Sequence, residues 1–269
     1  LGFDPWLHTP KEIESLKKAV AKAGATLVPL AFNPLDAAWE GRPAMPVSPA
    51  VAHPVEYTGK ESAEKRKELA VVLKQQSCEA GVLTLPEDIA WLLNIRGNDV
   101  PCTPFALSYA IVHQDASLDL FIDRRKMSPG LEAHLGSQVR VHEIEGFVPA
   151  LELLGQSSLR VLMDPAKTHA RVETALQDSG AIVVHGDDPC QMPKAIKNPV
   201  EIQGMINAHI RDGAALTRFL AVLGEQGGAA KLDELSAAET VRKFRAENEK
   251  FRGLSFDSIA GAGGNGAIV

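Results

Sequence analysis

The sequence predicts an α/β fold in which helices pack on a mixed sheet, followed by the start of a second, α+β region. Between residues 60 and 196, short apolar segments alternate with longer amphipathic ones, which is the pattern of a sheet covered by helices. After residue 197, two long amphipathic segments follow each other and lead into a glycine-rich run. Parallel strand pairs are expected wherever a helix lies between two strands.

The first part of the chain, residues 1–59, is predicted to hold one helix, one strand and an irregular segment. Apolar residues recur at helical spacing from residue 10 to 23, and Gly24 stands where a helix cap belongs. A short strand is expected over residues 25–30. Residues 32–57 contain five prolines, whose fixed φ angles and missing N–H donors predict a linker or an irregular domain edge.

The middle of the chain, residues 60–196, is predicted to form the mixed sheet and its helices. The polar residues 113–115 separate two strand-like segments and indicate a hairpin. Helices are expected over residues 62–76, 87–93, 148–154 and 168–178, and strands over residues 81–85, 105–112, 118–122, 139–144, 160–163 and 181–184.

The last part, residues 197–269, has a different pattern. An N-cap, a first-turn proline and a capping acid occupy residues 198–201, so a helix is predicted to start there and to end at the glycine pair 227–228. A second helix is expected over residues 233–248 because apolar positions recur every three residues. Strands are expected over residues 254–260 and 267–269, on either side of a run of glycines.

The charge balance argues against a nucleic-acid partner. The chain has a formal net charge of -6 and a pI near 5.8, whereas a phosphate-binding surface needs clustered Lys and Arg. The densest basic run is Lys65, Arg66 and Lys67, between Glu64 and Glu68. This spacing predicts a solvated helix face with ion pairs four residues apart.

Cysteine usage and hydropathy indicate a soluble protein of a reducing compartment. Cys78, Cys102 and Cys190 are widely separated, so neither a disulfide framework nor a thiolate zinc site is predicted. No apolar run approaches the roughly 20 residues of a membrane helix, and no signal peptide is evident. We therefore expect a cytoplasmic protein without a membrane partner. The chain starts at Leu1 rather than Met and stops at Val269 within an apolar stretch, so both ends are expected to be cut.

The glycine run near the C-terminus matches a phosphate-binding pattern. Gly261, Gly263 and Gly266 fit GxGxxG. The pattern alone is weak, because a dinucleotide site also needs a following helix and an acid about 20 residues on. A hairpin turn is favoured, since residues 267–269 are strand-like, and a dinucleotide site is the alternative.

Two short segments have the chemistry of metal ligands. Residues 185–188 and 209–212 each place a histidine near a carboxylate. Neither supplies three or four donors, and Arg211 beside Asp212 predicts local pairing, so a structural or solvated role is favoured at both. No HExxH or GxSxG motif occurs in the sequence. By motif alone, no catalytic and no metal-binding residue is predicted.

The loop formed by residues 96–101 is the candidate interdomain loop. It carries two opposite charges, Arg96 and Asp99, which could orient a neighbouring domain or line a cleft. Glycine, asparagine, aspartate and proline also favour turns for backbone reasons. A turn that caps the preceding helix is therefore the favoured interpretation, and an interdomain role is the alternative.

Five stretches of the chain carry a family resemblance, and they span essentially its whole length. They are GFDPWLHT at residues 2–9, NPLDAAWEGRP at 33–43, IAWLLNIRGNDVPCTPFALSYA at 89–110, KNPVEIQGMINAHIRDGAAL at 197–216 and GLSFDSIAGAGGNGAIV at 253–269. In these stretches the chain resembles the long, three-domain Xaa-Pro aminopeptidases (aminopeptidase P), which are metallopeptidases of the creatinase, or pita-bread, family.

The resemblance implies an identity for each part of the chain. Residues 1–59 would be the C-terminal tail of a first creatinase-like domain with a proline-rich linker. Residues 60–196 would be a second creatinase-like α/β domain, and residues 197–269 the N-terminal part of a pita-bread catalytic domain. The parent enzyme would remove the N-terminal residue from peptides with proline in second position.

The resemblance also implies a cofactor that lies outside this chain. In that family two metal ions, usually manganese, are held by two Asp, one His and two Glu, and they activate a water molecule. All five ligands would lie beyond Val269, so no catalytic or metal residue is carried over. The chain alone is expected to be inactive and to hold no cofactor, whereas its parent would bind a peptide substrate and could form a homodimer.

Two other functions stay open. A pita-bread relative without metal ligands would be a non-catalytic module that binds a peptide or a partner protein. A relative of creatinase would act on a small non-peptide substrate. The segments at residues 33–43 and 95–101 favour the peptidase.

Overall fold

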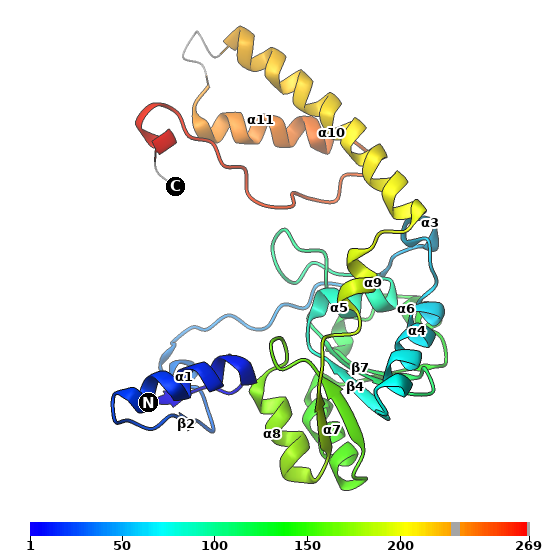
Figure 1. The fold of residues 1–269 in the computed structure, drawn as a ribbon. Coiled ribbons are helices and arrows are strands. Elements are labelled where there is room, and N and C mark those ends of the chain that lie inside the picture. The colour runs from blue at the N-terminus through cyan, green and yellow to red at the C-terminus, as the bar shows by residue number, and fades with distance from the viewer. Residues whose placement is uncertain (227–231, 268–269) are drawn as a thin grey trace. The chain divides into compact units, whose positions relative to one another are not determined.

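The computed structural model describes residues 1–226 and 232–267 (Figure 1). The chain divides into two compact units. The first unit comprises residues 1–100 and 104–196, and the second comprises residues 101–103 and 197–269. The expected mixed α/β architecture is confirmed in the first unit, which holds a six-stranded mixed sheet.

The N-terminal elements are a two-stranded sheet and a helix, which pack against Ala170. Strand β1 (Gly2–Phe3) pairs in parallel with β2 (Val28–Pro29), so the strand expected over residues 25–30 is confirmed only in part. Helix α1 (Pro10–Lys22) is confirmed, and Thr9 caps it by accepting a hydrogen bond from the Glu12 amide.

The proline-rich segment is more regular than its composition suggests. It contains α2 (Pro34–Ala38), β3 (Val51–Ala52) and α3 (Val55–Thr58), and β3 pairs antiparallel with β5 (Ile95–Arg96). The prediction that prolines exclude regular elements here is wrong. Proline is tolerated in the first turn of a helix, because the N–H that it lacks would have no helical partner there.

The six-stranded sheet has the order β10-β9-β4-β6-β7-β8. Antiparallel pairing joins β4 to β6 and β6 to β7, and the other three pairs are parallel. The expected hairpin is thus confirmed as β6–β7. The strands are β4 (Ala80–Leu83), β6 (Tyr109–His113), β7 (Leu118–Phe121), β8 (Val139–His142), β9 (Arg160–Met163) and β10 (Ile182–His185).

Helices cover both faces of this sheet, as the two buried clusters show. One cluster joins α4, α5 and α6 to residues such as Leu83 and Leu120. The other joins α7 and α8 to residues such as Val82 and Phe121, which point the opposite way along the same strands. The helices are α4 (Ser62–Gln75), α5 (Pro86–Leu93), α6 (Leu131–Leu135), α7 (Phe147–Gln156), α8 (Ala170–Ser179) and α9 (Gln191–Ala195).

The basic run of α4 corrects the expected solvated face. Lys67 is exposed, but Lys65 and Arg66 are buried. Lys65 Nζ donates to the Trp91 carbonyl (2.8 Å) and to Asn94 Oδ1 (2.7 Å), and it lies 4.4 Å from the Trp91 ring centroid. Arg66 donates to the carbonyl of Ala116. Long cationic side chains can be buried when their polar ends find such partners.

The second unit is built on two helices, α10 (Pro199–Gln226) and α11 (Glu234–Ala246). Both expected helices are confirmed, and the Asn198–Glu201 cap is present, with the Glu201 amide donating to Asn198 Oδ1 at 3.0 Å. The glycine pair 227–228, expected to end the first helix, lies outside the described residues.

The strands expected near the C-terminus are not observed. Residues 254–260 make no strand ladder with any other described residue, and an isolated strand leaves its backbone groups without partners. Residues 263–267 form the 3-10 helix η4 (Gly263–Ala267). The expected strand at residues 267–269 is therefore wrong at Ala267, while Ile268 and Val269 lie outside the described residues.

Candidate functional site

The candidate interdomain loop begins where α5 ends. Asn94 adopts a left-handed conformation (φ 51°) at the C-cap of α5, and β5 follows directly. A Cβ atom on Gly97 would lie 2.7 Å from the Ala106 nitrogen, so glycine permits a close approach of two backbone segments. The same approach explains why residues 105–108 are not part of β6, since the Asp99 amide donates to the Phe105 carbonyl at 3.3 Å.

Asp99 is the buried anchor of this loop. Its Oδ2 lies 2.7 Å from Lys126 Nζ, and neither side chain is more than 3% exposed. The carboxylate also accepts hydrogen bonds from the amides of Ser48 (3.1 Å) and Leu107 (2.7 Å). Asp99 therefore ties the proline-rich segment, the loop and the 3-10 helix η1 (Arg124–Lys126) together.

Arg96 makes local contacts and influences a half-buried histidine, His53. It donates to the carbonyls of Ala90 (3.2 Å) and Ile95 (2.8 Å). Burial, followed by the positive charges of Arg96 and Lys65, lowers the pKa of His53 to about 4. These contacts join Arg96 and Asp99 to other residues of the first unit, and an interdomain role for the two residues stays a prediction.

The first metal-ligand segment is not a cluster. His185 Nε2 lies 2.6 Å from Glu173 Oε1, and Asp187 is exposed. Asp188 is buried instead, beside Asp88 of α5. The side chains of His185 and Asp188 therefore have separate partners.

The second metal-ligand segment is held by helix contacts. His209 Nδ1 lies 2.8 Å from the Met205 carbonyl on the same helix. Asp212 pairs with Arg245 of α11 at 2.6 Å, so the expected pairing with Arg211 is wrong. A helix places adjacent residues about 100° apart, and a residue on a neighbouring helix can reach the carboxylate more easily.

The glycine-rich run near the C-terminus is hydrogen-bonded to a carboxylate. Glu234, the first residue of α11, accepts hydrogen bonds from the Ala262 amide (2.6 Å) and from Asn265 Nδ2 (3.2 Å). A negative side chain on these donors opposes the binding of a pyrophosphate. The favoured hairpin turn is not observed either, because the residues before the run do not form a strand.

A polar cluster on the sheet was missed by motif reasoning. Asp119 of β7 lies 2.6 Å from His113 Nε2 and 2.7 Å from His142 Nε2, and Arg140 donates to both of its oxygens at 2.7 Å. Burial raises the pKa of Asp119, but these hydrogen bonds outweigh it and hold the pKa well below its usual range. The signal was the alternation of polar residues on three strands, which places these side chains on one face.

This Asp119 cluster is suited to stabilising the sheet rather than to catalysis. A carboxylate only accepts hydrogen bonds, so each histidine donates its ring proton to it. With Arg140 also bound to both oxygens, the carboxylate has no free position for a substrate or a metal ion.

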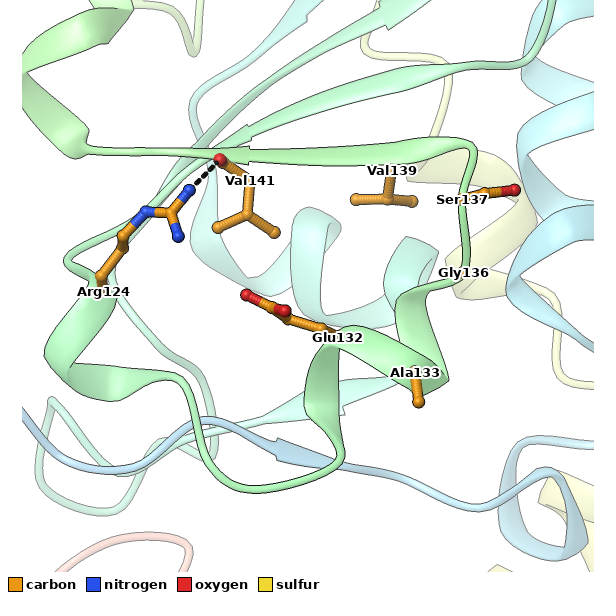
Figure 2. A pocket seen from close by; sticks show the side chains of 7 residues that line it. All are labelled: Arg124, Glu132, Ala133, Gly136, Ser137, Val139 and Val141. Carbon is orange, nitrogen blue, oxygen red and sulfur yellow. Dashed lines mark hydrogen bonds between the residues drawn. The ribbon is translucent and has the colours of Figure 1, made fainter.

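Two hollows mark the surface of the first unit. One, of about 510 Å³, lies between β8 and α6, and in it Arg124 Nη2 donates to the Val141 carbonyl at 2.8 Å (Figure 2). The other, of about 740 Å³, is lined by Trp6, Phe32 and Arg171 among others. Neither hollow contains a nucleophile paired with a base.

Metal ligands do not gather in the part of the chain that the structure describes. Among residues 1–226 and 232–267, no three His, Cys, Asp or Glu side chains come close enough together to hold a metal ion. Over the same residues, no helix is both long and apolar enough to cross a membrane.

Comparison with known proteins gives consistent matches over the chain. Residues 41–201 match the family model described as the Creatinase/Prolidase N-terminal domain. A probable Xaa-Pro aminopeptidase P from Talaromyces stipitatus is 37% identical over 278 aligned residues, which cover the whole of this chain and 42% of that protein. The chain thus spans less than half the length of this relative.

Solved structures agree with this match. The X-prolyl aminopeptidase from Caenorhabditis elegans, a cytosolic enzyme with a di-nuclear active site, is 33% identical with a TM-score of 0.87. The match covers 96% of this chain and 43% of that one. An Xaa-Pro dipeptidase from Bacillus anthracis shares the fold at 13% identity, with a TM-score of 0.53 over 70% of this chain and 49% of its own. The chain belongs to the creatinase/prolidase N-terminal domain family.

Proposed function

We propose that this chain is part of a metal-dependent aminopeptidase that removes the N-terminal residue from peptides with proline in second position. The likeness to the Caenorhabditis elegans X-prolyl aminopeptidase supports this, because it extends over 96% of the chain at 33% identity. The relatives at 32–37% identity carry the same activity in their descriptions. The substrate of the whole protein would then be a peptide.

The proposed division into parts follows the expected one. Residues 1–59 would be the tail of a first creatinase-like domain, residues 60–196 the second such domain, and residues 197–269 the beginning of the pita-bread domain. The separation of two compact units between Ile196 and Lys197 supports the second boundary. The pairing of β3 with β5 places the end of the proline-rich segment against the middle domain.

The proposed enzyme uses two divalent metal ions, expected to be manganese. The residues described here do not fit such a centre, because no three ligand side chains come together. We therefore assign no step of the reaction to this chain, which would be inactive alone and would serve as a folded support. The proposed location is the cytoplasm, and homodimer formation by the parent stays a prediction.

The experiment starts from the coding DNA, read in frame beyond the Val269 codon. The full product is purified and assayed on two peptides that differ only in proline or alanine at position two, with Mn²⁺ and with a chelator. Release of the first residue from the proline peptide, abolished by the chelator, is expected. If the full product binds the proline peptide but never cleaves it, the non-catalytic binding module replaces the peptidase.

A further inference from the structure

Two aspartates from different elements meet in the interior of the first unit. Asp88 lies in the first turn of α5, and Asp188 lies between β10 and α9. Asp88 is 1% exposed and Asp188 is 6% exposed. Two ionised carboxylates in such a place would repel each other strongly, since little water is available to screen them.

Asp88 has one charged partner in this arrangement. Lys194 of α9 forms an ion pair with Asp88 Oδ1. Apart from this ion pair, neither carboxylate oxygen of Asp88 has a hydrogen-bond donor among the described residues. A buried acceptor without a donor is costly, so another donor is required.

Asp188 is placed to supply that donor. Its side chain lies beside Asp88, while its Oδ1 accepts from the Cys190 amide at 2.8 Å. Burial, followed by the negative charge of Asp88, raises the pKa of Asp188 to about 7. A protonated Asp188 would donate to Asp88, and the remaining negative charge would be balanced by Lys194.

We propose that Asp88 and Asp188 share one proton, and that this proton makes the pair a pH-dependent latch holding α9 against α5. With the proton in place, the pair carries one negative charge against the positive charge of Lys194. Without it, two negative charges face one positive charge, and the contact between α5 and α9 weakens. This inference concerns the conformation of the first unit and does not depend on the proposed peptidase activity.

Two other charged groups, Asp164 and Lys167, lie near the pair formed by Asp88 and Asp188. Asp164 accepts a hydrogen bond from the Asp188 amide (3.2 Å), and Lys167 lies 3.7 Å from Asp164. The positive charge of Lys167 lowers the pKa of Asp188, but less than burial and Asp88 raise it. The Cys190 thiol stays neutral, because burial, followed by the two aspartates, raises its pKa well above the usual value.

The direction of the pH effect follows from the raised pKa. A carboxyl group with a raised pKa in the closed form stabilises that form fully below its unfolded pKa of about 4. This stabilisation is lost as the pH rises through about 7, the pKa of Asp188 in the folded form. The opening of α9 should therefore increase about tenfold per pH unit between about pH 4 and pH 7, and then level off.

Hydrogen exchange of α9 tests the latch directly in the 269-residue chain. The amides of Lys194 and Ile196 donate within α9 to Cys190 and Met192, so their exchange reports its opening. Protection factors, corrected for intrinsic rates, are compared between about pH 5 and pH 8. The wild-type values should fall with pH, those of Asp188→Asn should stay flat, and those of Asp187→Asn, an exposed neighbour, should follow the wild type.

Two results would refute the proposal that this pair is a pH-dependent latch. One is a wild-type protection that does not change over this range, and the other is an Asp188→Asn variant with the wild-type slope. If the variant does not fold, carbon-13 NMR of labelled aspartates in the wild-type chain decides. One carboxyl titrating near pH 7 supports the shared proton, whereas titration of every aspartate below about pH 5 refutes it.

Discussion

Asp99 and Lys126 form a buried ion pair in which Oδ2 and Nζ lie 2.7 Å apart. The two residues are 27 positions apart in the sequence, and the amides of Ser48 and Leu107 complete the coordination of the carboxylate. A buried pair need not contribute more stability than an apolar pair would, but removing one member leaves a buried charge.

Neutralising Asp99 should therefore destabilise the first unit strongly. Asp99→Asn keeps the shape of the side chain but leaves the Lys126 ammonium without a counter-charge, and we expect a loss of about 3–5 kcal/mol in the free energy of unfolding. Urea denaturation followed by circular dichroism measures it. Glu14→Gln, in the exposed pair with Lys18, serves as the control and should leave the midpoint unchanged. Equal midpoints for wild type and Asp99→Asn would show that the pair has no structural role.

Lys65 should matter for stability although it lies in a basic run. Replacing it with methionine removes the donor to Asn94 Oδ1 and to the Trp91 carbonyl, and we expect a loss of about 3 kcal/mol. Lys67→Met changes the same charge at an exposed position two residues away and should have little effect. Similar melting temperatures for the two variants would mean that Lys65 is solvated after all.

Gly97 should tolerate no side chain. A Cβ atom there would lie 2.7 Å from the Ala106 nitrogen and 2.8 Å from the Phe105 carbonyl carbon, both of which are backbone atoms that cannot rotate away. Gly97→Ala should cost about 1–3 kcal/mol in unfolding free energy. The control is Gly204→Ala in α10, where nothing lies within 4 Å and helix propensity predicts a gain of about 0.5–1 kcal/mol. A neutral Gly97→Ala variant would contradict the close approach.

Local patterns predicted most of the first unit, because the signals of its strands and helices lie within each segment. Short apolar segments marked the strands, and longer amphipathic segments marked α4, α5, α7 and α8. The partners of buried charges could not be predicted from such local patterns. Lys65 meets Asn94 across 29 residues and Asp99 meets Lys126 across 27. No short pattern contains both members of such a pair, so the basic run was misread as solvated.

The prediction of a strand over residues 254–260 was wrong for a different reason. Residues 254–260 have the composition of a strand, but a strand is stabilised by a neighbouring strand rather than by its own sequence. The same limit applies to Asp88 and Asp188, which are 100 positions apart in the sequence. Their contact follows from the packing of α9 on α5. No local sequence pattern predicts that packing.

Asp119 should make stability depend on acid pH. Because the hydrogen bonds from His113, Arg140 and His142 lower its pKa despite the opposing effect of burial, its stabilising contribution is present above about pH 4 and is lost as the pH falls. Asp119→Asn should thus be less stable than wild type at neutral pH, and the difference should shrink in acid. Urea unfolding at about pH 7, 5 and 3 measures this, with the exposed Asp178→Asn as control. A difference that is constant with pH would exclude the linkage.

Helices α10 and α11 should exchange their amide hydrogens much faster than the central strands in this 269-residue chain. Helices α10 and α11 bury only Ala215 and Val241 among their described apolar residues. The exposed apolar side chains of α10 are Val200, Ile202, Met205, Ile206, Ile210, Leu216, Leu220 and Leu223. Helices with so little buried area gain little tertiary stability, so local opening should be frequent.

Hydrogen exchange followed by mass spectrometry compares peptides from α10 with peptides from β4 and β6, whose core residues are almost wholly buried. Protection in α10 should lie close to that of an isolated helix, and dilution of the sample should not change it. Protection equal to that of β4 would contradict this expectation. If such protection fell on dilution, it would reveal that a second copy of the chain covers the apolar face of α10, because only an intermolecular contact depends on concentration.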